Sequence, residues 1–425
     1  MRSLALILLS FSPLFHCSAQ QSIEAQKQFY TYRAEHYLDK DRALGSYYTI
    51  NDSGIFISAL SPEKVFYREF GIAWKDVDAL RQIIHCLPDD SLLTFLSKRE
   101  WLELPACSNK SDETSAESEK KLSGIKIAID PGHIAGDMKT AILEKKYVSF
   151  NYNGRDIKIA EGMLTLQTAL ILKHLLEEQG AEVMLTRDRP NQTAFGITFS
   201  EWREQHFKNA VDSLYHIKEL TEEEKTFLLT KAGARDIFRN CFNNLDMKQR
   251  AKKINSYAPD LTVIIHYNVD EKNIGWHKPG TRNYNMLFTG GSFLKNELEK
   301  PEDRIAFFRL LLADDLGLSQ VLAESLINSF SEKLGVPSAT EQDADYLKKY
   351  CLVSRTQGVF ARNLTLTRLV KGAVVYGETL YQDNEKECLL LTAADTEVYG
   401  VKTSARVKQV AEAYYEGIRK YLDKK

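Results

Sequence analysis

The alternation of short apolar runs with long amphipathic stretches from residue 125 onward constrains the fold of this chain most strongly. Runs of strand length lie at 125–129, 181–187, 261–265 and 373–376, and helical stretches lie at 162–179, 246–257, 317–334 and 404–422. The run at 261–265 has no polar residue except Thr262, which is typical of a strand buried on both faces. Strands that alternate with helices of this length predict an α/β fold with a mostly parallel sheet, flanked by helices on both faces.

The first residues have the pattern of a secretory signal peptide, with Arg2, an apolar run at 4–15 and the small residues Ser18 and Ala19. The run is shorter than the roughly 20 apolar residues that a membrane-spanning helix needs. We therefore expect residues 1–19 to be a signal peptide and the mature protein to be exported, periplasmic or secreted, with no transmembrane segment. A buried N-terminal helix is the alternative interpretation of this run.

The rest of the chain divides at a polar stretch, 108–123, which reads SNKSDETSAESEKKLS. Such a composition cannot bury enough apolar surface to offset its ordering entropy, so we expect a linker. Residues 20–107 then form a small α+β module of unknown role, in which we find no catalytic constellation. Residues 124–425 form the larger catalytic domain, and polar stretches at about 190–243 and 273–315 interrupt it as insertions.

Charge and cysteine usage exclude some classes of function. Lysine and arginine number 56 against 58 aspartate and glutamate residues, so the formal net charge is only −2. This balance lacks the basic character of a nucleic-acid-binding protein, and we expect no nucleic-acid partner. The six cysteines are scattered without a CxxC spacing, which argues against a zinc ribbon or a redox dithiol.

Two histidines follow buried strands directly. His133 comes after the run IAIDPG, and His266 comes after the run VII. Ligands of open α/β sheets bind beyond the carboxyl ends of the strands, so both side chains are expected at one rim of the sheet. Glu161 begins the first long helix and can point to the same rim. Two imidazoles and one carboxylate make a zinc site with one position open for water, as catalytic zinc sites have.

Glu378 supplies a proton-transfer group. It follows the apolar run at 373–376, so it also belongs at the carboxyl end of a strand. A glutamate beside a zinc-bound water can take up the proton of that water and return it to a departing amine. The four residues together predict a hydrolytic zinc centre.

Four motifs in order, over residues 125–424, resemble those of the zinc-dependent N-acetylmuramoyl-L-alanine amidase family. The first motif is IAIDPGH, and the second is a helix that begins AEGMLTLQTAL together with the strand VMLTRD that follows it. The third is VIIHYN, and the fourth is AVVYGETLYQDN. The resemblance implies that His133, Glu161 and His266 bind Zn²⁺ and that Glu378 is the general base and acid. It also implies that the enzyme acts on peptidoglycan or muropeptides, cutting the amide between N-acetylmuramic acid and L-alanine, with no cofactor beyond zinc.

The chain departs from this family in the expected cleft. Members usually have Gly-Gly after the first histidine and a proline before the last strand, where this chain has Ile134-Ala135 and Gly372. In some members an insertion after the second histidine folds over the zinc as an inhibitory helix, and residues 293–316 occupy a similar place. We hypothesise that this segment gates the cleft, with Glu297 or Glu299 reaching the metal, and that an activator protein acts on it.

Two other functions remain open. A zinc peptidase cutting within peptidoglycan stem peptides would use the same chemistry with a different pocket. A non-catalytic wall-binding regulator would keep the metal site without turnover, although the presence of all four site residues weighs against it.

Overall fold

The computed structural model describes residues 22–85, 87, 89–98, 121–275 and 278–424. The signal peptide predicted at 1–19 and most of the linker predicted at 108–123 lie outside this part of the chain. Within the described part, no helix is both long enough and apolar enough to span a membrane.

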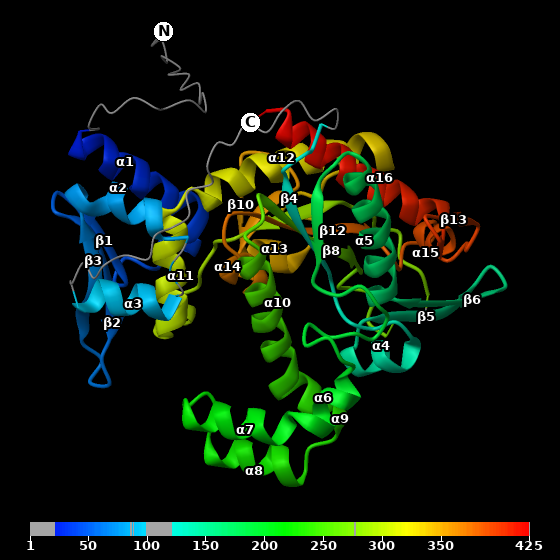
Figure 1. The fold of residues 1–425 in the computed structure, drawn as a ribbon, viewed down its shortest axis with the longest axis horizontal. Coiled ribbons are helices and arrows are strands. Elements are labelled where there is room, and N and C mark those ends of the chain that lie inside the picture. Colours follow the sequence, from blue (N-terminus) through cyan, green and yellow to red (C-terminus); the bar gives the residue numbers. More distant parts are fainter. Residues whose placement is uncertain (1–21, 86, 88, 99–120, 276–277, 425) are drawn as a thin grey trace.

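A seven-stranded sheet forms the centre of the molecule, in the order β10-β11-β9-β12-β8-β4-β7 (Figure 1). The neighbours β7, β4, β8 and β12 run parallel to one another. Strand β9 is antiparallel to β12 and parallel to β11, and β10 is antiparallel to β11. The predicted α/β fold with a mostly parallel sheet is confirmed. The strands are β4 (Lys126–Pro131), β7 (Glu182–Leu185), β8 (Leu261–Asn268), β9 (Met286–Thr289), β10 (Cys351–Val353), β11 (Val359–Arg362) and β12 (Ala373–Tyr381).

Helices cover both faces of this sheet. Successive side chains of a strand point to opposite faces, so each central strand contributes to two apolar cores. Ile129 and Val263 belong to the core shared with α5, α12 and α16, whereas Ala128 and Ile264 belong to the core shared with α10 and α14. These helices and the smaller elements around them are α4 (Met138–Glu144), β5 (Tyr147–Tyr152), β6 (Arg155–Ala160), α5 (Glu161–Glu178), α10 (Asn243–Tyr257), α12 (Asp315–Leu334), α13 (Asp345–Tyr350), α14 (Thr365–Leu369), α15 (Glu387–Leu391), β13 (Thr396–Val398), β14 (Val401–Thr403) and α16 (Ala405–Leu422).

The stretch expected as an insertion at about 190–243 folds into helices that project from the sheet at the far end of α10 (Figure 1). Trp202, Phe238 and Phe242 are among the apolar side chains that give this projection a core of its own. Ile134, the residue after His133, packs into that core. The helices are α6 (Phe199–Gln205), α7 (Phe207–His216), α8 (Glu222–Thr230), α9 (Ala234–Ile237) and a π-helical turn (Phe238–Phe242) that runs into α10.

The described residues between 22 and 98 form a module around a three-stranded antiparallel sheet. The helix α11 (Pro301–Leu312), from the stretch expected as the second insertion, completes the core of this module (Figure 1). The ring centroids of Phe308 and Phe70 are 5.4 Å apart, and those of Phe307 and Tyr48 are 5.3 Å apart. The elements here are α1 (Ile23–Arg33), a π-helical turn (Ala34–Leu38), 3-10 turns (Lys40–Arg42 and Glu297–Glu299), β1 (Tyr48–Asn51), β2 (Gly54–Leu60), β3 (Phe66–Ala73), α2 (Trp74–Ile83) and α3 (Asp89–Lys98).

The expectation that Glu297 or Glu299 reaches the metal site is therefore wrong. The Glu297 carboxylate accepts the N–H of Leu294 at 2.8 Å. Arg304 donates to the carbonyl of Glu299 at 2.9 Å and pairs with Glu69 of β3 at 2.5 Å. All side chains from 303 to 312 are buried, so α11 needs the module as its apolar partner and does not lie over the cleft.

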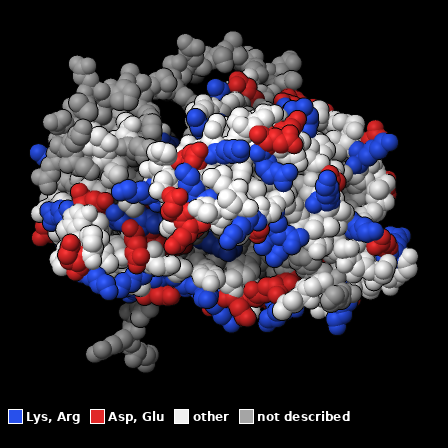
Figure 2. All heavy atoms as spheres, turned by 90° about the horizontal axis from the view of Figure 1, so that it is seen from below, with Lys and Arg blue, Asp and Glu red and all other residues white. Residues whose placement is uncertain are grey.

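Charge on the molecular surface is mixed. On the face seen from below, lysine and arginine side chains lie interspersed with aspartate and glutamate (Figure 2). That view agrees with the near balance of 56 basic and 58 acidic residues in the sequence.

Candidate metal centre

His133 and His266 meet at the carboxyl ends of β4 and β8. The two strands are parallel neighbours, and the Gly132 N–H donates to the carbonyl of Ile265 at 2.9 Å. A side chain on Gly132 would collide with the His266 ring, because a Cβ built there lies 2.2 Å from ring atoms. Glycine is thus the residue that lets the His133 loop approach His266, and the two ring centroids are 4.7 Å apart.

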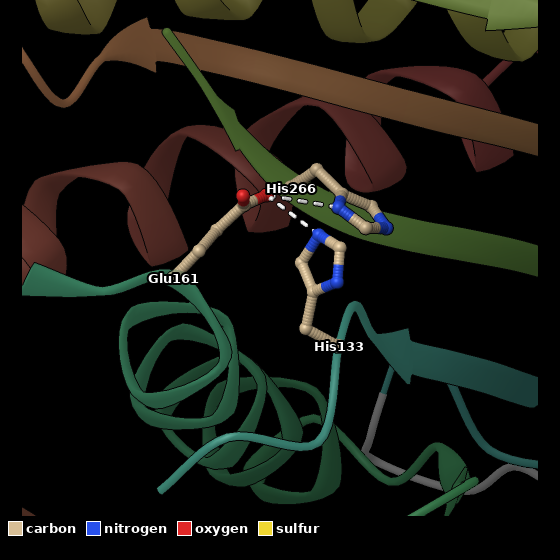
Figure 3. A group of neighbouring side chains, drawn as sticks. All are labelled: His133, Glu161 and His266. Carbon is tan, nitrogen blue, oxygen red and sulfur yellow. Dashed lines mark hydrogen bonds and ion pairs between the residues drawn. The ribbon is translucent and has the colours of Figure 1, made fainter. Parts of the chain in front are cut away.

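Glu161, the first residue of α5, brings its carboxylate to one side of the two rings, within reach of both (Figure 3). Its Oε1 lies 3.0 Å from His266 Nδ1 and 3.3 Å from His133 Nε2. The same oxygen accepts the backbone N–H of Tyr267 at 3.3 Å. The structure therefore brings together the three residues that the sequence predicted as ligands.

Burial sets the protonation of this group. It lowers the pKa of His133 to about 3, and it also lowers the pKa of His266, so both rings are neutral near pH 7. Burial alone would raise the pKa of Glu161, but its interaction with His133, the charge of Lys146 and the hydrogen bonds with both histidines hold it well below its usual value. Neutral imidazoles and an ionised carboxylate are the forms that bind a metal ion.

The three residues fit a metal ion. Their ligand atoms all lie within 4.8 Å of one another. His133 Nε2 is buried and has no hydrogen bond of good geometry within the described structure, although it points at this cluster. A buried polar atom without a partner is costly, and a cation held by the three side chains would remove that cost. Histidine with carboxylate is a ligand set typical of catalytic zinc.

Glu378 lies on β12 directly opposite His266 of β8 in the sheet register. Its side chain remains partly exposed. Burial raises the pKa of Glu378 to about 8, and the charge of Glu161 adds to this effect, whereas Lys146 and Arg362 oppose it. A carboxyl group whose pKa lies this close to neutrality can both accept and donate a proton.

A buried charge network holds the His133 loop in place. The Arg250 guanidinium donates to the carbonyls of Pro131 at 3.0 Å and His133 at 3.2 Å. It also pairs with Asp130 at 3.2 Å and Asp246 at 2.8 Å. The loop needs this support because His133 has a φ of 59°, which is unusual for a residue other than glycine.

Two further supporting residues were not identified as such from the sequence. Arg187, inside the quoted motif VMLTRD, donates to the carbonyls of Gly132 at 3.1 Å and Gly162 at 2.7 Å, so it ties the loop to the start of α5. Glu144 accepts the N–H groups of Ile134 at 3.0 Å and Ala135 at 2.9 Å. No motif signals Glu144, because its contacts arise only when α4 folds back on the loop.

Other histidines lie outside this group. His174 stacks on Tyr399 at 4.8 Å, His36 stacks on Tyr32 at 3.9 Å, and His216 contacts the Asp212 carbonyl at 2.6 Å. His277 lies outside the described residues.

Comparison with known proteins points to one family. The family profile for N-acetylmuramoyl-L-alanine amidase matches residues 127–420. The solved CwlD amidase from Clostridioides difficile, in complex with the GerS lipoprotein, is 18% identical over 70% of this chain and 98% of that chain, with a TM-score of 0.39. The apo N-acetylmuramyl-L-alanine amidase Ami1 from Mycobacterium abscessus is 18% identical over 71% of this chain and 100% of that chain, with a TM-score of 0.36. No curated protein matches.

The profile match covers well over half of the 425 residues. It includes the two histidines, Glu161 and Glu378, and the whole central sheet lies within it apart from the first residue of β4. The chain belongs to the N-acetylmuramoyl-L-alanine amidase family.

Proposed function

We propose that this protein is a zinc-dependent peptidoglycan hydrolase that cleaves the amide between N-acetylmuramic acid and L-alanine of the stem peptide. The observation that supports this most directly is the cluster of His133, Glu161 and His266, in which the buried Nε2 of His133 lies 3.3 Å from Glu161 Oε1 without a hydrogen bond of good geometry. Membership of the amidase family supports the proposal that this amide is the bond cleaved. The two histidines and one glutamate support the proposal that the metal ion is zinc.

Each residue has a defined role in this proposal. His133, Glu161 and His266 hold the ion, which when bound supplies a Lewis acid that polarises the scissile carbonyl and lowers the pKa of water. Glu378 takes the proton from the attacking water and returns it to the leaving amine of L-alanine. Arg250 and Glu144 keep the His133 loop in the conformation that this ligand needs.

We further propose that the protein is exported and acts in the periplasm or outside the cell, where its substrate is. An activator protein that contacted residues 293–316 would act through the N-terminal module, because these residues pack into it. Its effect on the metal site would then be indirect.

Digestion of purified muropeptides, followed by mass analysis, tests the function. The wild type should release free stem peptides, and the variants His133→Ala and Glu378→Gln should each lose at least about 100-fold in kcat, the scale of a general acid–base contribution. Zinc content should fall in His133→Ala and stay near one ion in Glu378→Gln. His174→Ala is the matched control, since this residue lies on the same helix as Glu161 but stacks on Tyr399.

The alternatives give different products. Shortened stem peptides that remain attached to the sugar would mean a peptidase. Stoichiometric zinc without turnover of any muropeptide would mean a wall-binding regulator. Equal activity of the wild type and both site variants would overturn the site itself.

A further inference from the structure

On the face of the sheet that carries His266 and Glu378, three aromatic side chains lie side by side across β12, β9 and β11. We call Tyr376, Phe288 and Phe360 the aromatic wall. Tyr376 stacks on His266, with the centroids 4.3 Å apart. Tyr376 pairs with Phe288 of β9 in the register, and Phe288 pairs with Phe360 of β11. Side chains two residues apart on a strand share a face, so Arg362 follows Phe360 on the same wall.

The Arg362 guanidinium lies against two of these rings. Its Cζ is 4.9 Å from the ring centroid of Tyr346 on α13 and 5.3 Å from that of Phe288. The side chain is only partly buried. Contacts of this kind fix the direction of a guanidinium but leave its N–H groups free to donate.

No carboxylate in the described structure pairs with Arg362, and its side chain makes no hydrogen bond there. Several other buried or partly buried arginines of the chain do pair with a carboxylate. Arg250 pairs with Asp130, Arg304 with Glu69, Arg309 with Asp315 and Arg406 with Glu387. Arg362 is thus an oriented cation, on the wall of the candidate active site, with its fork of donors unused.

The charge of Arg362 reaches the site. It opposes the rise in the pKa of Glu378 that burial and Glu161 cause, and it also acts on the pKa of Tyr376 and Tyr346. The geometry agrees, because the guanidinium lies against Phe288, which pairs with Tyr376, two residues before Glu378 on the same face of β12. The Lys146 carbonyl accepts the Glu161 N–H at 3.3 Å, so this second cation is tied to the start of α5.

We propose that Arg362 binds a free carboxylate of the stem peptide and makes the enzyme selective for stems whose acidic residue is not amidated. The inference rests on the proposed function, because it concerns the substrate of the same site. A guanidinium donates two parallel hydrogen bonds to a carboxylate. A carboxamide offers one acceptor oxygen and an NH₂ group that faces the donors, so it is bound less well.

Matched substrates test this proposal. They are two muropeptides that differ only in a carboxylate or a carboxamide at the acidic stem residue. The wild type should cleave the carboxylate form about 10- to 100-fold better in kcat/KM, the effect of hydrogen bonds to a charged group. In Arg362→Gln the preference should fall to about one through loss of activity on the carboxylate form alone, and Arg362→Lys should retain part of it.

Lys349→Gln is the matched control, since it removes a positive charge from an exposed position on α13, which also carries Tyr346. It should keep the preference of the wild type. If Arg362 only supports the aromatic wall, Arg362→Gln will weaken both substrates equally, which overturns the proposal. Equal cleavage of both substrates by the wild type also overturns it.

Binding separates this inference from the proposed function. In the Glu378→Gln background, calorimetry should give tighter binding of the carboxylate muropeptide, and adding Arg362→Gln should abolish the difference. A wild type that cleaves neither muropeptide sinks the proposed function, and the binding preference then still decides the role of Arg362. Equal binding of both muropeptides sinks the carboxylate site even if the enzyme is an active amidase.

Discussion

Two polar interruptions of the sheet pattern, at about residues 190–243 and 273–315, look alike in sequence and differ in the folded molecule. The first builds its own apolar core from Trp202, Phe238 and Phe242, and this core includes Ile134 beside His133. The second donates α11 to the N-terminal module, where Phe307 and Phe308 pack against Tyr48 and Phe70.

The difference teaches that the position of an insertion in the chain does not decide whether it bears on the active site. An insertion bears on the site only if its apolar side chains pack against elements that carry the site residues. The 293–316 segment follows the second candidate histidine in sequence, yet it stabilises a module elsewhere. The 190–243 segment is the one that touches the loop carrying His133, through Ile134.

The largest expected effect is that of replacing residues 293–316 with a short flexible linker. Because α11 fills the core of the N-terminal module, the module should lose most or all of its stability, which for a small domain is about 5–15 kcal/mol at most. Limited proteolysis should then cut within residues 22–98. A variant with a protease-resistant module and raised amidase activity would restore the gating hypothesis.

A pair of single substitutions sharpens the comparison. Phe308→Ala should cost about 3–5 kcal/mol and Ile134→Ala about 2–5 kcal/mol, since both side chains are fully buried. Only Ile134→Ala should also lower kcat at a temperature where both variants are folded, because Ile134 adjoins His133. Denaturant unfolding and muropeptide kinetics measure the two effects, and a lowered kcat in Phe308→Ala alone would reverse the assignment.

Zinc should stabilise the two regions unequally. At about 100 times its Kd, a ligand adds about 2.7 kcal/mol to the stability of the folded unit that binds it. Hydrogen exchange should slow in β8, in the start of α5 and in the turn at 238–242, with no change in α11. The His133→Ala variant should lose the response, and equal slowing in α11 would show that both insertions are coupled to the site.

Arg33→Ala should have a smaller effect, confined to the N-terminal module. The Arg33 guanidinium donates to the carbonyls of Leu311 at 2.9 Å and Ala313 at 2.6 Å, which closes the end of α11. Loss of these bonds leaves buried carbonyls unpaired and should cost about 1–3 kcal/mol. Thermal unfolding should show this loss with kcat unchanged, and a change in kcat would link α11 to the site.

Ile217→Ser should have the smallest effect. Ile217 is 63% exposed just after α7, at the far side of the first insertion. Stability should change by less than about 0.5 kcal/mol, as for most surface positions. An altered kcat with unchanged stability would mean that the tip of the insertion, and not only its core, takes part in substrate binding.

Much of the site could be predicted from local signals. Apolar runs predicted β4, β8 and β12, and the residues after or within their ends were His133, His266 and Glu378. The supporting residues were harder to find. Arg187 was visible only as part of a motif, and Glu144 carries no signal, because each acts through backbone groups that come near only after folding.

The sequence by itself determined the α/β sheet and the four residues at its rim, because side-chain alternation and strand ends are properties of neighbouring residues. Only the tertiary structure decided which surface α11 covers and where the Arg362 guanidinium lies. Both depend on contacts between distant parts of the chain, such as the bond from Arg33 to the Leu311 carbonyl, 278 residues away. An apolar face in the sequence indicates that it will be buried, but the folded chain selects its partner.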